Sequence, residues 1–78
     1  MPKIPIIKEK DFFRYILKYN CELISVKGSH HKISNKLNNK TSIVPIHGSN
    51  DLKKGMFAKI IKDLDIDIDE FIEFIKNN

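Results

Sequence analysis

The 78-residue sequence predicts an α+β domain with the order α-β-β-β-α, a three-stranded antiparallel sheet and a short C-terminal helix. Apolar residues recur at helical spacing on both sides of the chain's centre, and three β-prone segments with turn residues between them lie in the middle. Short connections between consecutive strands favour an antiparallel meander with both main helices on one face. So few side chains can build only one core, and we therefore expect a single domain over residues 1–78.

The first helix is predicted over residues 8–20, where apolar residues recur three and four apart: Phe12, Phe13, Ile16, Leu17 and Tyr19. Asn20 tolerates a left-handed conformation and makes a plausible stop. Residues 23–27, LISVK, are β-prone and predict the first strand. Gly28 then permits a turn.

The second strand is predicted over residues 29–34, SHHKIS. Successive side chains of a strand point to opposite faces, so His30 and Lys32 share one face while His31 and Ile33 share the other. Residues 35–40 are polar and turn-prone, and residues 41–46 predict the third strand. Pro45 cannot donate to a ladder, which places it near the strand's end or on an edge.

Residues 47–50 form a loop before a second helix that has Gly55 near its beginning and an apolar face of Phe57, Ile60, Ile61 and Leu64. Residues 63–69 alternate as a strand would. However, Asp67 and Glu70 have the spacing of a capping box, and the apolar residues that follow keep helical spacing. We therefore expect a third helix, and we expect a ligand to lie on the sheet face that the helices leave open.

Charge divides the chain into a basic body and an acidic tail. Residues 1–62 hold 13 of the 14 Lys and Arg but 4 of the 10 Asp and Glu, so they carry a net charge of +9 and the rest carries −5. A basic body favours phosphate-rich partners, although a solvated surface explains it equally well. The single cysteine, Cys21, excludes an internal disulfide and fits a reducing compartment. No secretion signal or membrane anchor is visible, so a cytoplasmic protein is expected.

Of the three histidines, His30 is the candidate for proton transfer, because imidazole exchanges protons near neutral pH and Lys32 on the same face can hold a phosphate. An ordinary surface histidine fits the same local pattern. His31 faces the helices and is interpreted as structural. His47 follows the third strand, where a phosphate contact and a turn role are both open. His30 and His31 cannot reach one metal ion from opposite faces, and no serine triad or Gly-rich phosphate loop is present.

Several of these segments together resemble the HicA-like (YcfA-like) mRNA interferase toxins of type II toxin–antitoxin systems. They are the first helix, Lys27-Gly28-Ser29-His30-His31, Val44-Pro45-Ile46-His47, and residues 51–61, DLKKGMFAKII. The pattern differs at Met56-Phe57, where a threonine and a leucine are common, and in the extended acidic tail after Leu64. The resemblance implies a fold like that of double-stranded-RNA-binding domains.

The resemblance also implies an activity: metal-independent endoribonuclease cleavage of mRNA with His30 as the single catalytic histidine. Lys27, Gly28, Ser29, Lys32 and His47 would then contact the RNA, no cofactor is implied, and the partner would be a cognate HicB-type antitoxin. Two other possibilities remain: a non-catalytic RNA-binding module of the same fold, and a regulatory protein-interaction domain. A DNA-binding helix-turn-helix is disfavoured because β-prone segments separate the helices.

Overall fold

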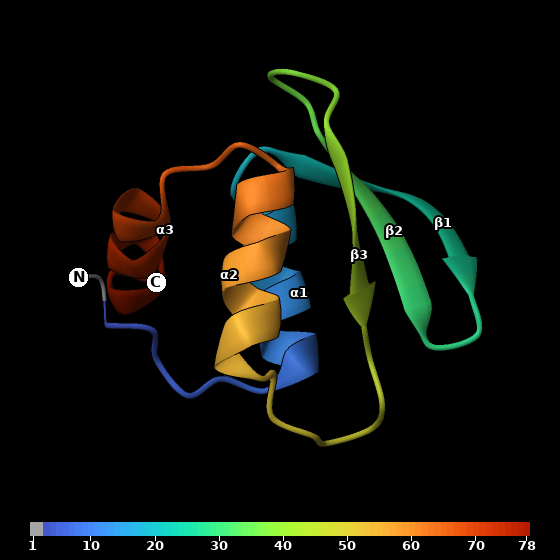
Figure 1. Cartoon of the computed structure of the whole chain (residues 1–78), viewed down its shortest axis with the longest axis horizontal. Coiled ribbons are helices and arrows are strands. Elements are labelled where there is room, and N and C mark those ends of the chain that lie inside the picture. The colour runs from blue at the N-terminus through green and yellow to red at the C-terminus, as the bar shows by residue number, and fades with distance from the viewer. Residues whose placement is uncertain (1–2) are drawn as a thin grey trace.

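A computed structural model describes residues 3–78 of the chain (Figure 1). Its elements follow the predicted order, and the α+β fold like that of double-stranded-RNA-binding domains is confirmed. The elements are α1 (Glu9–Lys18), β1 (Cys21–Lys27), β2 (His30–Asn35), β3 (Thr41–Pro45), α2 (Lys54–Asp63) and α3 (Ile68–Lys76).

The three strands form one antiparallel sheet in the order β1-β2-β3. A two-residue loop, Gly28-Ser29, joins β1 to β2, and Gly28 has a φ of +59°, which glycine adopts without strain. His30 lies opposite Lys27 of β1 and opposite Pro45 of β3. Directly opposed residues point to the same face, so these three side chains share one side of the sheet.

The central strand β2 presents its two histidines to opposite faces. His30 is exposed, whereas His31 is half-buried and its ring packs against Phe13 of α1 with the centroids 5.0 Å apart. The predicted opposition of the two rings is therefore confirmed. The alternation ends at Ser34 and Asn35, which are both buried, and the Asn35 side chain donates a 2.9 Å hydrogen bond to the Leu64 carbonyl.

Helices α1 and α2 cover one face of the sheet, and α3 lies against them on the side away from the strands (Figure 1). The core between these layers is rich in aromatic rings. Phe12 of α1 packs edge-to-face on Phe57 of α2 at 5.0 Å and on Phe71 of α3 at 5.5 Å, and all three are fully buried. The sheet's other face carries no helix of the described residues, so it is open as predicted.

The element ends have local causes. Asn20, with a φ of +70°, reverses the chain after α1, so β1 begins at Cys21, two residues earlier than predicted. The third helix is confirmed, because Asp67 caps α3 by accepting a 3.1 Å hydrogen bond from the Glu70 backbone amide. β3 ends at Pro45, one residue early, although the Ile46 amide still donates to the Ser29 carbonyl at 2.8 Å.

The N-terminal segment is joined to the loop between β3 and α2. The Leu52 amide donates to the Ile7 carbonyl at 2.8 Å, and the Glu9 amide donates to the Asn50 carbonyl at 3.0 Å. Lys8 adds a hydrogen bond to the Ser49 carbonyl at 3.0 Å. These bonds fix the loop between β3 and α2 to the N-terminal segment. They also place Glu9, the first residue of α1, against that loop.

Candidate active site

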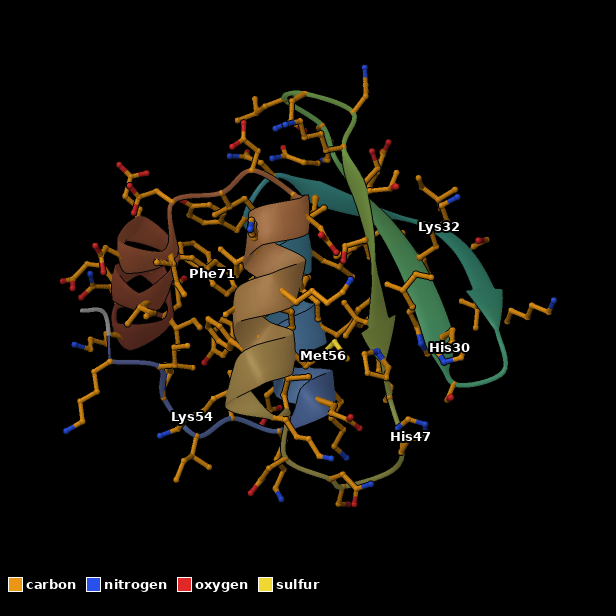
Figure 2. The ribbon with its side chains drawn as sticks, in the orientation of Figure 1. His30, Lys32, His47, Lys54, Met56 and Phe71 are labelled. Atoms are coloured by element: carbon orange, nitrogen blue, oxygen red, sulfur yellow. The ribbon has the colours of Figure 1, made fainter. Side chains whose placement is uncertain are left out.

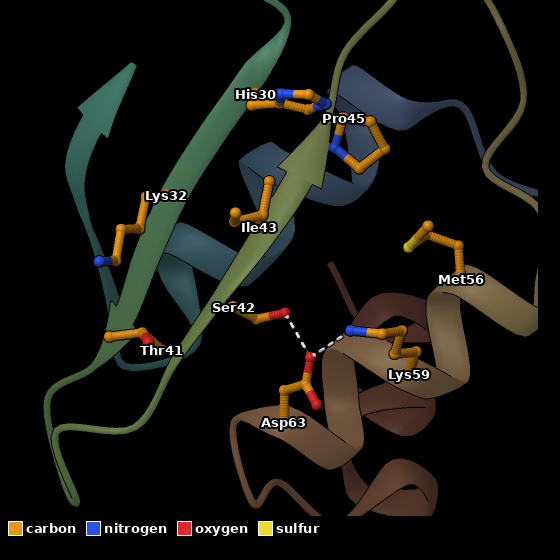
Figure 3. A pocket seen from close by; sticks show the side chains of 9 residues that line it. All are labelled: His30, Lys32, Thr41, Ser42, Ile43, Pro45, Met56, Lys59 and Asp63. Atoms are coloured by element: carbon orange, nitrogen blue, oxygen red, sulfur yellow. Dashed lines mark hydrogen bonds and ion pairs between the residues drawn. The ribbon is translucent and has the colours of Figure 1, made fainter. Parts of the chain in front are cut away.

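The imidazole of His30 opens into a hollow of about 440 Å³ between the sheet and α2, which we call the His30 groove (Figure 3). The ring lies beside Pro45 at the end of β3, with Met56 of α2 on the opposite side. The nine residues that line the groove are His30, Lys32, Thr41, Ser42, Ile43, Pro45, Met56, Lys59 and Asp63. An exposed imidazole and two lysines therefore share one concave surface.

One wall of the groove comes from α2 and was not predicted from the sequence. Met56, Lys59 and Asp63 lie three and four residues apart, so they form one stripe along the helix. Only the apolar face of this helix entered the prediction, although a lysine followed four residues later by an aspartate is a recognisable surface pair. What the sequence does not reveal is that this stripe lies beside β3 and lines the same groove as His30.

Asp63 ties this helix to β3. One of its oxygens, Oδ2, accepts a 3.0 Å hydrogen bond from Lys59 Nζ and another of 3.0 Å from Ser42 Oγ. The hydrogen bond from Lys59, followed by that from Ser42, lowers the pKa of the Asp63 carboxyl below its ordinary value of 3.8. The Lys59 side chain remains two-thirds exposed, so it can also meet a ligand in the groove.

His47 does not line the His30 groove but lines a separate hollow next to it. This second hollow, which we call the His47 hollow, has a volume of about 490 Å³ and is also lined by Glu9, Pro45, Asn50, Asp51, Lys53 and Met56. Pro45 and Met56 line both hollows, so the two meet there. In Figure 2, His30 and His47 lie at the same end of the sheet.

The remaining predicted site residues surround His30 without lining its groove. Lys27 is exposed opposite His30, at the end of β1. Gly28 and Ser29 form the turn, and the Ser29 carbonyl accepts from the Ile46 amide. A methyl group added at Gly28 would meet no atom of the chain within 4 Å, so the turn needs glycine for its φ and not for space.

Metal-ligating clusters and membrane-spanning helices are both missing from the described part of the chain. Residues 3–78 contain no group of three or more His, Cys, Asp and Glu side chains placed to hold a metal ion. None of the helices in the same residues is both long and apolar enough to cross a bilayer.

Sequence comparisons identify the family. A family model described as the HicA toxin of bacterial toxin–antitoxin systems matches residues 10–66, and the chain therefore belongs to the HicA toxin family. A curated relative, named probable mRNA interferase HicA from Pseudomonas fluorescens (strain Pf0-1), is 34% identical over 58 residues, which cover 74% of this chain and 93% of the relative. No solved structure matches the chain. Helix α3 lies beyond the matched segment.

Proposed function

We propose that the chain is the toxin of a type II toxin–antitoxin pair and acts as an endoribonuclease on mRNA without a metal ion, with His30 as its catalytic histidine. The observation that carries the proposal is the exposed His30 imidazole in a groove with Lys32 and Lys59, on a sheet face that no described helix covers. The family and the name of the Pseudomonas relative support the same activity.

The mechanism follows from what imidazole and ammonium groups do to a phosphodiester. His30 takes the proton of a ribose 2′-hydroxyl as its oxygen attacks phosphorus, or protonates the departing oxygen. Lys32 and Lys59 hold the phosphate and offset the charge that grows on its oxygens. These groups supply both proton transfer and charge stabilisation, so the scheme needs no metal ion.

RNA binding is proposed for the surface around this groove. Lys27 and Lys32 contact backbone phosphates on the open face, and the Gly28-Ser29 turn leaves room for the RNA backbone beside His30. His47 extends the same contact surface past the end of β3. Such a surface reads backbone charge and shape more than base identity.

The partner proposed for the same surface is a HicB-type antitoxin protein in the cytoplasm. The family belongs to toxin–antitoxin systems, and an exposed groove with lysines is a natural place for an inhibitor to block RNA access. An antitoxin that covers His30 would prevent cleavage without changing the fold of the toxin.

The test is a cleavage assay with labelled RNA, with and without a chelator. We expect wild-type protein to cleave in both conditions and His30→Ala to lose activity by about 100-fold or more while keeping its circular dichroism spectrum. His31→Gln is the matched control, because it changes the neighbouring imidazole that faces α1 and should retain cleavage. Full activity of His30→Ala would reject the assignment, and RNA binding without cleavage by wild type would favour a non-catalytic RNA-binding module.

A further inference from the structure

Glu9 is a nearly buried carboxylate, and both of its oxygens lie against His47. The residue is 7% exposed, at the first turn of α1. Its Oε1 accepts a 2.8 Å hydrogen bond from the His47 backbone amide, and its Oε2 lies 3.6 Å from His47 Nδ1. A carboxylate taken out of water is costly unless it is hydrogen-bonded and paired, so these two contacts explain how Glu9 is tolerated there.

The contacts orient the imidazole. Because the two ring nitrogens lie on different sides of the ring, Nδ1 facing Glu9 leaves Nε2 facing away from the carboxylate, and the His47 side chain is 52% exposed. A carboxylate behind an imidazole fixes the direction in which the ring points. Asp51 and Lys53 also line this hollow and bring one charge of each sign.

The position of His47 brings it to the end of the His30 groove. Pro45 lies opposite His30, the Ile46 amide bonds to the Ser29 carbonyl, and His47 is the next residue along. The two hollows share Pro45 and Met56 as lining residues, so they adjoin each other between the two imidazoles.

We propose that Glu9 is a positioning residue that holds His47 as the general acid of RNA cleavage, with His30 as the general base. This inference rests on the proposed endoribonuclease function and adds a second histidine to it. The roles follow the geometry: Glu9 lies against Nδ1 of His47, so that Nε2 faces away from the carboxylate, and His30 lies in the groove that Lys32 also lines.

The step balances without any further reactant. The ribose 2′-oxygen forms a bond to phosphorus while its proton passes to His30, and the bond from phosphorus to the 5′-oxygen breaks while that oxygen takes a proton from His47. The products are a 2′,3′-cyclic phosphate and a 5′-hydroxyl. Proton exchange with water then returns both rings to their starting forms.

The experiment compares two versions of an RNA that wild-type protein cleaves, one ordinary and one with sulfur in place of the 5′-oxygen at the mapped cleavage position. A thiolate leaves without being protonated, so it does not need the general acid. We expect His47→Ala to cleave ordinary RNA about 100-fold more slowly than wild type, and Glu9→Gln about tenfold more slowly. Both variants should cleave the sulfur substrate within about twofold of wild type, whereas His30→Ala should fail on both substrates.

Glu9→Gln is chosen because its side-chain oxygen can still accept from the His47 amide while the negative charge is lost. Lys8→Met is the matched control: it removes the Lys8 bonds to the same loop without touching the imidazole, and should cleave both substrates like wild type. Equal losses of Glu9→Gln and His47→Ala on the two substrates, or the same pattern in Lys8→Met, would overturn the assignment in favour of a purely structural role. Wild-type protein that cleaves no RNA would instead refute the proposed function.

Discussion

Single residues of this protein show how burial and hydrogen bonding decide what a reactive group does. The Cys21 thiol is buried at the start of β1, and burial raises its pKa to about 11 despite the opposing effect of Lys36. Asp63 experiences the reverse, because hydrogen bonds from Lys59 and Ser42 favour its charged form and lower its pKa. The thiol is thereby kept inert, and the carboxylate is kept ionised at the groove.

Cys21 should therefore resist alkylation in the folded protein. The thiolate is the reactive form, and at about pH 7.5 a thiol with a pKa of about 11 is almost wholly protonated. We expect iodoacetamide to leave the native protein unmodified over an hour and to label it completely in about 6 M guanidinium chloride. Mass spectrometry measures the difference, and rapid labelling of native protein would contradict the burial of this thiol.

Asp63 should make stability depend on pH in acid. Its pKa is lower in the folded state than the ordinary 3.8, so the unfolded state binds more protons and stability rises with pH in that range. The contribution is complete above about pH 5 and is lost as the pH falls through 3.8 towards the lower folded value. Urea midpoints between about pH 2.5 and 6 should fall less steeply for Asp63→Asn than for wild type. Glu22→Gln, an exposed change on β1, should follow the wild-type curve.

Among the elements, α3 completes the core. It lies outside the segment matched by the family model, yet its Phe71 is fully buried against Phe12 and Phe57. The Tyr19 ring packs on both Phe71 and Phe74, so these two residues extend the same aromatic cluster. Without α3, the rings of Phe12 and Phe57 would be exposed to water on the side where Phe71 now covers them.

Removal of the Phe71 ring should cost much of the fold's stability. Phe71→Ala takes away the ring that packs on Phe12, Tyr19 and Phe57, and changes of this kind cost about 3–5 kcal/mol, a large part of what a small domain has. Urea denaturation followed by circular dichroism measures it. Phe71→Leu keeps most of the volume and should cost about 1 kcal/mol. Equal stability of Phe71→Ala and wild type would show that α3 does not contribute to the core.

The elements could be predicted from the sequence because their signals are local. Apolar spacing revealed α1 and α2, and the capping pair Asp67 and Glu70 distinguished α3 from a strand. The strand ends differed from the prediction, because whether Cys21 or Ile46 pairs depends on the neighbouring strand and not on its own propensity. The placement of His30 and His31 on opposite faces of β2 followed from alternation alone.

For the molecule as a whole, the candidate site depends on contacts between distant parts of the chain. Lys59 and Asp63 reach the His30 groove only because α2 packs beside β3, and Glu9 meets His47 across 38 positions. No local pattern encodes such contacts. The candidate site residues named from the sequence all lie on the sheet or in the loops beside it: Lys27, Gly28, Ser29, His30, Lys32 and His47. The helix residues that line the His30 groove or contact His47 could not be named from the sequence.

The affinity for RNA should fall as salt is added, and the steepness of the fall should reflect the number of phosphates that Lys32 and Lys59 contact. In a His30→Ala background, which prevents cleavage, the affinity for single-stranded RNA should fall linearly on a log–log plot against salt. Replacing both Lys32 and Lys59 with alanine should reduce the slope by about 1.4, because each phosphate that is no longer neutralised accounts for about 0.7. Lys76→Ala on α3 removes a lysine from the far side and should leave the slope unchanged. An unchanged slope in the double variant would place the RNA elsewhere.

Helix α3 also has a consequence for the way the molecule meets a polyanion. This helix carries acidic residues and lies on the side of α1 and α2 away from the strands (Figure 1). Lysines such as Lys27 and Lys32 belong to the strands. The protein is thus a small electric dipole. The field of the proposed RNA ligand would turn the strands towards it during diffusion, and added electrolyte would screen this effect.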